Sequence, residues 1–195
     1  MPEEILIAAD HAGFELKEKL EAQLRQLGYD VRDFGTNSAE STDYPDYAHP
    51  LAKEVSAGHA KRGVLVCGTG LGMSYVANRY PNVRAAVVWS PEIAELARSH
   101  NDANVLVLPS RFVDDEQASS ILKKWLETPF EGGRHERRVV KIEAQGEPRA
   151  ARTSKPKRQS GERAARASKP KAQSSKPKAR SPKPKAKKPT RKGKR

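Results

Sequence analysis

The stretch that decides the fold reads GVLVCGTGLGMS and spans residues 63–74. It joins a short apolar run, 63–67, to a glycine-rich turn. An apolar run of this length, bounded by glycines, is typical of a strand that is buried in a parallel sheet. The sequence therefore predicts a buried strand, then a turn and the start of a helix, which is a repeating unit of α/β folds.

The same alternation continues on both sides of this unit. Four further strands are predicted at 5–9, 29–34, 84–89 and 104–108. Helices are predicted at about 16–27, 47–57, 91–100, 114–126 and 134–143. Five parallel strands with intervening helices make a five-stranded, doubly wound αβα sandwich of the Rossmann or flavodoxin type, which binds ligands beyond the carboxyl ends of its strands.

Charge is distributed unevenly along the 195 residues. Residues 1–145 hold 17 Lys and Arg against 22 Asp and Glu, a net charge of −5, whereas residues 146–195 hold 20 against 2, a net charge of +18. After Ala144 no apolar residue larger than alanine occurs. Because burial there cannot offset an ordering cost of about 1–2 kcal/mol per residue, we expect a folded domain at 1–145 and a disordered basic tail at 146–195.

Cysteine content and hydropathy bear on the compartment. The single cysteine excludes an internal disulfide and a multi-cysteine zinc site, which fits a reducing environment. The apolar run 5–9 lacks a basic flank, and no segment approaches the ~18–20 apolar residues that span a bilayer. We expect a soluble, cytoplasmic protein.

Cys67 and the turn after it are the first candidates for chemistry. Glycines at a strand–helix junction let backbone amides face an anion, although this turn lacks both the P-loop ending and the GxGxxG spacing. The same amides are expected to lower the pKa of the Cys67 thiol, so that its thiolate serves as a base. The alternative is a tight turn that follows a buried core cysteine.

Other polar residues are predicted to meet Cys67 at the same edge of the sheet. Asp10 and His11 follow the first strand directly, and residues 42–45 lie in the loop after the second. Each alone is also typical of capping or turn hydrogen bonds. Their convergence on one edge favours a site.

Two further pairs lie elsewhere in the sequence. Arg134 and Arg138 are four residues apart, so on a helix both point the same way and suit a phosphate, unless they form a solvated basic face. His100 and Asn101 precede the fifth strand, so they are expected near the edge opposite Cys67. If His100 works with Cys67, a second subunit must supply it, and we therefore predict a homodimer with a shared site.

The order of these motifs resembles that of the ribose-5-phosphate isomerase B group, which also includes galactose-6-phosphate isomerase subunits and allose-6-phosphate isomerases. The resemblance covers about residues 3–143. It is carried by ADHAGF at 9–14, GT at 35–36, TDYP at 42–45, CGTG at 67–70, AN at 77–78, SHND at 99–102 and EGGRH at 131–135. It implies an aldose–ketose isomerase that acts on a sugar phosphate through an enediolate, without metal or cofactor.

The resemblance also implies roles for individual residues. Cys67 would be the base that moves a proton between carbons 1 and 2, and His100 the acid that opens the furanose ring, assisted by Asp10. Thr69 would complete the catalytic set. Backbone amides would hold the enediolate oxygen along the turn formed by Gly68, Thr69, Gly70, Leu71, Gly72, Met73 and Ser74. Phosphate would contact His11, Arg111, Arg134 and Arg138, and sugar hydroxyls would contact Asp43, Tyr44 and Asn101.

Substrate size and the tail leave alternatives open. Some family members use a glutamate where this chain has Met73, which here leaves Cys67 as the base. Ribose 5-phosphate is favoured, but no motif measures pocket depth, so allose 6-phosphate stays an alternative. The tail resembles those of histone-H1-like proteins, and non-specific binding of nucleic acid or another polyanion is the second hypothesis beside a solubilising role. Membrane binding is disfavoured because no apolar face accompanies the charge. An inactive scaffold is disfavoured because every residue proposed for chemistry is present.

Overall fold

The computed structural model describes residues 1–143. The predicted tail at 146–195 and its boundary lie outside the described residues, so the expectations for that segment stay predictions. No helix within residues 1–143 combines the length and apolarity that a membrane crossing requires.

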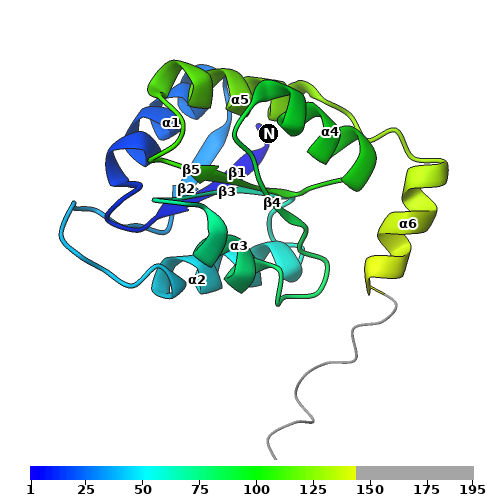
Figure 1. Cartoon of the computed structure of the whole chain (residues 1–195), viewed down its shortest axis with the longest axis horizontal. Helices are drawn as coiled ribbons and strands as arrows, with labels where there is room; N and C mark the ends of the chain where they lie inside the picture. The colour runs from blue at the N-terminus through cyan, green and yellow to red at the C-terminus, as the bar shows by residue number, and fades with distance from the viewer. Residues whose placement is uncertain (144–195) are drawn as a thin grey trace, which may run out of the picture. The chain divides into compact units, whose positions relative to one another are not determined.

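Five parallel strands form one sheet in the order β2-β1-β3-β5-β4 (Figure 1). They are β1 (Glu4–Ala9), β2 (Asp30–Asp33), β3 (Arg62–Cys67), β4 (Ala85–Val87) and β5 (Val105–Pro109). All five predicted strands are confirmed, although β2 and β4 are shorter than predicted and form the two edges of the sheet. The fully buried β5 lies between β3 and the half-buried β4, so the last two strands are exchanged relative to chain order.

Helices cover both faces of the sheet, which confirms the doubly wound sandwich (Figure 1). One face carries α1 (Phe14–Gln26), α4 (Pro91–Asn101) and α5 (Asp115–Glu127), and the other carries α2 (Pro45–Ser56) and α3 (Leu71–Ala77). The sixth helix, α6 (Arg134–Glu143), packs against α4 at the side of the domain.

The core explains why these segments take these forms. Leu16, Leu20 and Leu24 recur at helical spacing and are all buried on the inner face of α1, while Gly28 follows the helix with a φ of 86°. Val64 and Val66 of β3 pack on one face of the sheet and Leu65 packs on the other, because successive strand side chains point to opposite faces. The two apolar layers on either side of the sheet are the result.

A close approach fixes the beginning of α1 against β3. A Cβ atom on Gly13 would lie 2.5 Å from the carbonyl oxygen of Val66, so no side chain fits there. This contact brings the turn after β1 next to the carboxyl end of β3. The loops after both strands therefore share one edge of the sheet, as the topology of a parallel sheet requires.

Candidate active site

A cleft of about 190 Å³ opens at the carboxyl edge of the sheet. It is lined by Asp10, His11, Ala12, Tyr44, Cys67, Gly68, Thr69, Gly72 and Arg111. The loops after β1, β3 and β5 form its walls, and Tyr44, the N-cap of α2, completes it. The structure thus brings together the polar residues that the sequence placed at this edge, with the exceptions of Thr42 and Asp43, which do not line the cleft.

Cys67 is the last residue of β3 and is only 4% exposed. Its sulfur accepts a hydrogen bond from the Gly70 amide at 3.1 Å, in a turn where Gly70 has a φ of 74°. Burial raises the pKa of the Cys67 thiol, and the Asp10 carboxylate raises it further, while the amides of Met73, Gly70 and Thr69 oppose this shift. The predicted lowering of this pKa is therefore wrong, because the loss of hydration outweighs the amides.

The turn after Cys67 is already partly hydrogen-bonded within itself. The Ser74 amide donates to the Gly70 carbonyl at 3.1 Å, and the Ser74 hydroxyl donates to the Leu71 carbonyl at 2.8 Å. The sequence predicted that the Ser74 amide binds an oxyanion, but this amide is not free to do so, because it donates to the Gly70 carbonyl and closes the first turn of α3. Gly68, Thr69 and Gly72 are the residues of the turn that line the cleft.

Asp10 and His11 are held in defined orientations. The Asp10 Oδ1 atom accepts hydrogen bonds from the amides of Ala12 at 3.0 Å and Gly13 at 3.1 Å, so the predicted turn chemistry coexists with a place in the cleft. The Nδ1 atom of His11 lies 3.2 Å from the Thr42 amide nitrogen. When that amide donates to Nδ1, the proton of a neutral His11 resides on Nε2, which is then a donor suited to a phosphate oxygen.

Two glycines let large side chains lie over the turn. A Cβ atom on Gly72 would lie 2.7 Å from Cζ of Tyr44, and one on Gly68 would lie 3.1 Å from Nε of Arg111. The aromatic ring and the guanidinium group thus rest directly on the backbone beside Cys67. Arg111 supplies the positive charge of the cleft.

The remaining predicted residues gather elsewhere. His100 and Asn101 form the last turn of α4, which leads to the amino end of β5, and Arg134 and Arg138 lie on α6. None of these four residues lines the cleft. The expected separation of His100 from Cys67 within one chain is confirmed.

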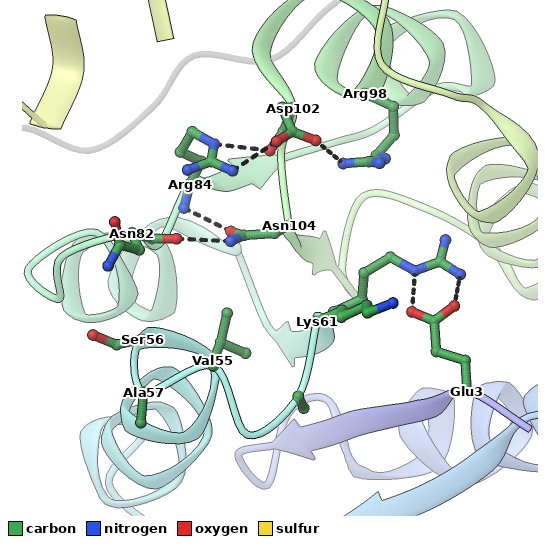
Figure 2. Close-up of a pocket in the computed structure, with 13 residues that line it drawn as sticks. Glu3, Val55, Ser56, Ala57, Lys61, Asn82, Arg84, Arg98, Asp102 and Asn104 are labelled. Carbon is green, nitrogen blue, oxygen red and sulfur yellow. Dashed lines mark hydrogen bonds and ion pairs between the residues drawn. The ribbon is translucent and has the colours of Figure 1, made fainter. Parts of the chain in front are cut away.

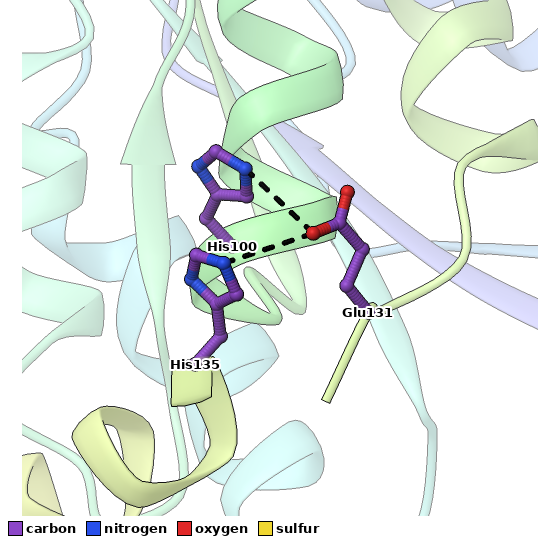
Figure 3. Close-up of side chains that lie close together, drawn as sticks. All are labelled: His100, Glu131 and His135. Atoms are coloured by element: carbon purple, nitrogen blue, oxygen red, sulfur yellow. Dashed lines mark ion pairs between the residues drawn. The ribbon is translucent and has the colours of Figure 1, made fainter. Parts of the chain in front are cut away.

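His100 lies in a cluster with Glu131 and His135 (Figure 3). The two imidazole rings stack with centroids 4.2 Å apart and planes 8° from parallel. Glu131 Oε2 lies 3.9 Å from His100 Nε2 and 3.7 Å from His135 Nε2. Glu131 and His135 were predicted from the sequence only as members of the EGGRH motif, without roles of their own, and the structure shows that the two glycines between them adopt positive φ values.

The arrangement of this cluster is unfavourable for a metal ion. The Nε of Arg134 donates a hydrogen bond to His135 Nε2 at 3.2 Å, which occupies the lone pair that a metal would need. Stacked, nearly parallel rings also direct their nitrogen lone pairs side by side, whereas metal ligands must converge on one point.

A second hollow, of about 810 Å³, lies at the amino edge of the sheet (Figure 2). Most of its charged side chains are paired with one another: Arg62 makes a bidentate pair with Glu3, and Arg84 and Arg98 share Asp102. The first pair joins the starts of β1 and β3, and the pairs to Asp102 join the segment before β4 and α4 itself to the end of α4, so these charges stabilise the fold.

Comparisons with known proteins agree with this geometry. A family model described as ribose/galactose isomerase matches residues 5–142. The ribose-5-phosphate isomerase B of Escherichia coli strain K12 is 46% identical over 140 residues, which cover 72% of this chain and 94% of the relative.

Solved structures give the same result. A ribose 5-phosphate isomerase from Thermotoga maritima is 54% identical, with a TM-score of 0.71 over 73% of this chain and 98% of its own. A ribose-5-phosphate isomerase B from Mycoplasma genitalium, solved with bound ribulose 5-phosphate, is 42% identical, with a TM-score of 0.71 over 74% of this chain and 96% of its own.

Proposed function

Because the chain belongs to the ribose/galactose isomerase family and is therefore a sugar-phosphate isomerase, we propose that it interconverts ribose 5-phosphate and ribulose 5-phosphate. The observation that carries this proposal is the cleft that sets the Cys67 sulfur beside Asp10, His11 and Arg111. The bound ribulose 5-phosphate in the Mycoplasma genitalium relative supports the choice of a pentose phosphate.

Ring opening is the first chemical step in the direction of the ketose. His100 gives a proton to the ring oxygen while Asp10 assists by drawing on the proton of the C1 hydroxyl, and the bond between C1 and the ring oxygen breaks. The product is the open-chain aldehyde with its C1 carbonyl in the cleft.

Proton transfer follows at the carbon atoms. The Cys67 thiolate takes the proton from C2, and the electron pair moves through C1 to the carbonyl oxygen, which gives the enediolate. The proton on O2 passes to O1, the thiol returns its proton to C1, and O2 becomes the ketone oxygen. Thr69 and the amides of the turn hold the charged oxygen, where one well-placed donor is typically worth about 3–4 kcal/mol of the barrier.

The raised pKa of Cys67 is consistent with a base. A thiolate whose conjugate thiol has a high pKa is a strong base, which suits the removal of a carbon-bound proton of low acidity. The amides of Gly70 and Met73 stabilise that thiolate without the need for a metal ion.

A shared site in a homodimer completes the proposal. The cleft holds His11 and Arg111 for the phosphate, whereas the acid and two further arginines lie on α4 and α6 of the same chain, outside the cleft. A two-fold symmetric pair of chains would bring the partner subunit's His100, Arg134 and Arg138 over the cleft. Asn101 and Tyr44 would then both contact the sugar hydroxyls.

The experiment is a turnover assay of the full-length protein with ribose 5-phosphate in buffer that contains a chelator, with allose 6-phosphate run alongside. We expect pentose turnover, and a loss of about 10³-fold or more in kcat for Cys67→Ala with little change in phosphate binding. Val83→Ala, which trims a buried side chain of the same core layer, is the matched control. Turnover of the hexose alone would correct the substrate, and turnover of neither sugar would overturn the proposal.

The basic tail supports a second candidate function, binding of nucleic acid through its phosphates. Residues 146–195 carry a net charge of +18 and no aromatic residue for base stacking. If the tail neutralises roughly eight phosphates, the logarithm of affinity for duplex DNA should fall with the logarithm of salt concentration at a slope of about −7, independent of sequence. A chain that ends at residue 145 is the control, and a slope near zero for the full chain would leave only a solubilising role.

A further inference from the structure

The two residues packed around His100 come from different parts of the chain and are held there by the backbone. The Glu131 amide donates to the Ser99 carbonyl at 3.0 Å, which ties the segment before α6 to the last turn of α4. Gly132 and Gly133 follow with φ values of 64° and 57°, a conformation that strongly favours glycine. This turn returns the chain so that His135 lies flat on the His100 ring (Figure 3).

His135 is neutral in this arrangement. Its Nε2 accepts a hydrogen bond from Arg134, so a proton is absent from that nitrogen. Burial lowers the pKa of His135, the positive charges of His100, Arg134 and Arg138 lower it further, and Glu131 acts in the opposite direction. A buried, neutral ring in van der Waals contact is a rigid surface that restricts the plane of the ring stacked on it.

The carboxylate of Glu131 is therefore available to pair with His100. Its Oε2 atom lies within 4 Å of both Nε2 atoms, but the Nε2 atom of His135 already accepts a hydrogen bond from Arg134, so His100 is the ring that Glu131 faces without a competitor. The other charged groups around the stack are Arg134 and Arg138 of α6, while Arg98 of α4 is engaged with Asp102 and the Ala103 carbonyl. Glu131 is the one carboxylate of the cluster, and it faces the Nε2 atom of His100 at 3.9 Å.

We infer that Glu131 and His135 are positioning residues for the ring-opening acid: His135 fixes the plane of the His100 ring by stacking, and Glu131 holds its carboxylate opposite the Nε2 atom of that ring. This inference rests on the proposed function, because it gives His100 the role of the acid. It assigns a purpose to two side chains that touch neither the cleft nor the sulfur of Cys67.

The test separates ring opening from proton transfer. Ribulose 5-phosphate has no furanose form, because its C5 oxygen carries the phosphate, so exchange of its C1 hydrogen with deuterated solvent reports proton transfer alone. We expect Glu131→Gln to lower kcat for ribose 5-phosphate by about tenfold or more, a fraction of what a general acid contributes, while the exchange rate stays within about threefold of wild type. His135→Phe, which keeps a stacking ring, should retain most turnover, whereas His135→Leu should lose about as much as Glu131→Gln.

The control is Glu54→Gln, which removes the carboxylate of another histidine pair, Glu54 with His59 at 3.4 Å, outside the site. It should leave both rates unchanged. An equal fall of turnover and exchange in Glu131→Gln would assign a merely structural role and overturn the inference, as would unchanged turnover in Glu131→Gln or in His135→Leu. An inactive wild-type protein would instead refute the proposed function, so the two failures are distinguishable.

Discussion

Mixing two inactive variants tests the shared site directly. Cys67→Ala removes the proposed base from the cleft at the carboxyl edge, and His100→Ala removes the proposed acid from the last turn of α4, outside that cleft. If each site combines the cleft of one subunit with the α4 and α6 residues of its partner, a hybrid dimer contains one site with both defects and one site with none.

The expected magnitude follows from this arrangement. Random exchange of equal amounts makes about half of all dimers hybrid, and one site of two in each hybrid is intact, so the mixture should regain about a quarter of wild-type activity. Each variant alone should be about 10³-fold or more below wild type. The assay is ribose 5-phosphate turnover after co-refolding, with hybrid formation measured by native mass spectrometry.

A second mixture provides the control. Cys67→Ala with Asp10→Asn places both defects in the cleft, so neither site of the hybrid is intact and no activity should return. Full hybrid formation without recovery in the first mixture, or recovery in the second, would refute the shared site.

Three further predictions concern the cleft and its support. Because burial raises the pKa of Cys67, the rate at which iodoacetamide alkylates this single thiol should rise with pH to a midpoint above about 8.5, and a midpoint below about 8.5 would contradict the burial argument. For the same reason, the contribution of this thiol to the free energy of unfolding should be fully present below its unfolded-state pKa and should be lost as pH rises through the folded-state pKa. Gly72→Ala places a methyl group 2.7 Å from Cζ of Tyr44 and should lower kcat/KM by about tenfold, measured by steady-state kinetics, whereas unchanged kinetics would show that the ring moves freely. Asp33→Ala removes a partner of the fully buried Lys17 ammonium and should lower the free energy of unfolding by about 3 kcal/mol in urea denaturation; a loss below 1 kcal/mol would mean that water reaches Lys17.

The fold was largely predictable because its information is local. Alternation of apolar runs with amphipathic stretches located all five strands and the helices that follow them. The order of the last two strands is a different kind of property. It depends on which strand buries both faces, and only the structure shows that β5 is fully buried while β4, with three residues, is half-buried at the edge.

The candidate site divides in the same way. Asp10 and His11 come directly after β1, and Cys67 ends β3, so the topology of a parallel sheet places them at one edge without further information. The stack of His100 with His135 depends instead on a turn through two glycines and on packing between α4 and α6, for which no spacing in the sequence gives a signal. The predicted direction of the Cys67 pKa shift was wrong for a related reason: burial, which raises this pKa, is a property of the assembled core and not of the local sequence.

The burial of the Cys67 sulfur also bears on how the enzyme withstands oxidants. Peroxide oxidises the thiolate, and the thiol only slowly, so a side chain that is 4% exposed and held largely in the thiol form reacts slowly. The chain contains no second cysteine to form a protective disulfide, so over-oxidation of Cys67 would be permanent. The same burial that raises the pKa of the proposed base would therefore also protect it from oxidation between turnovers.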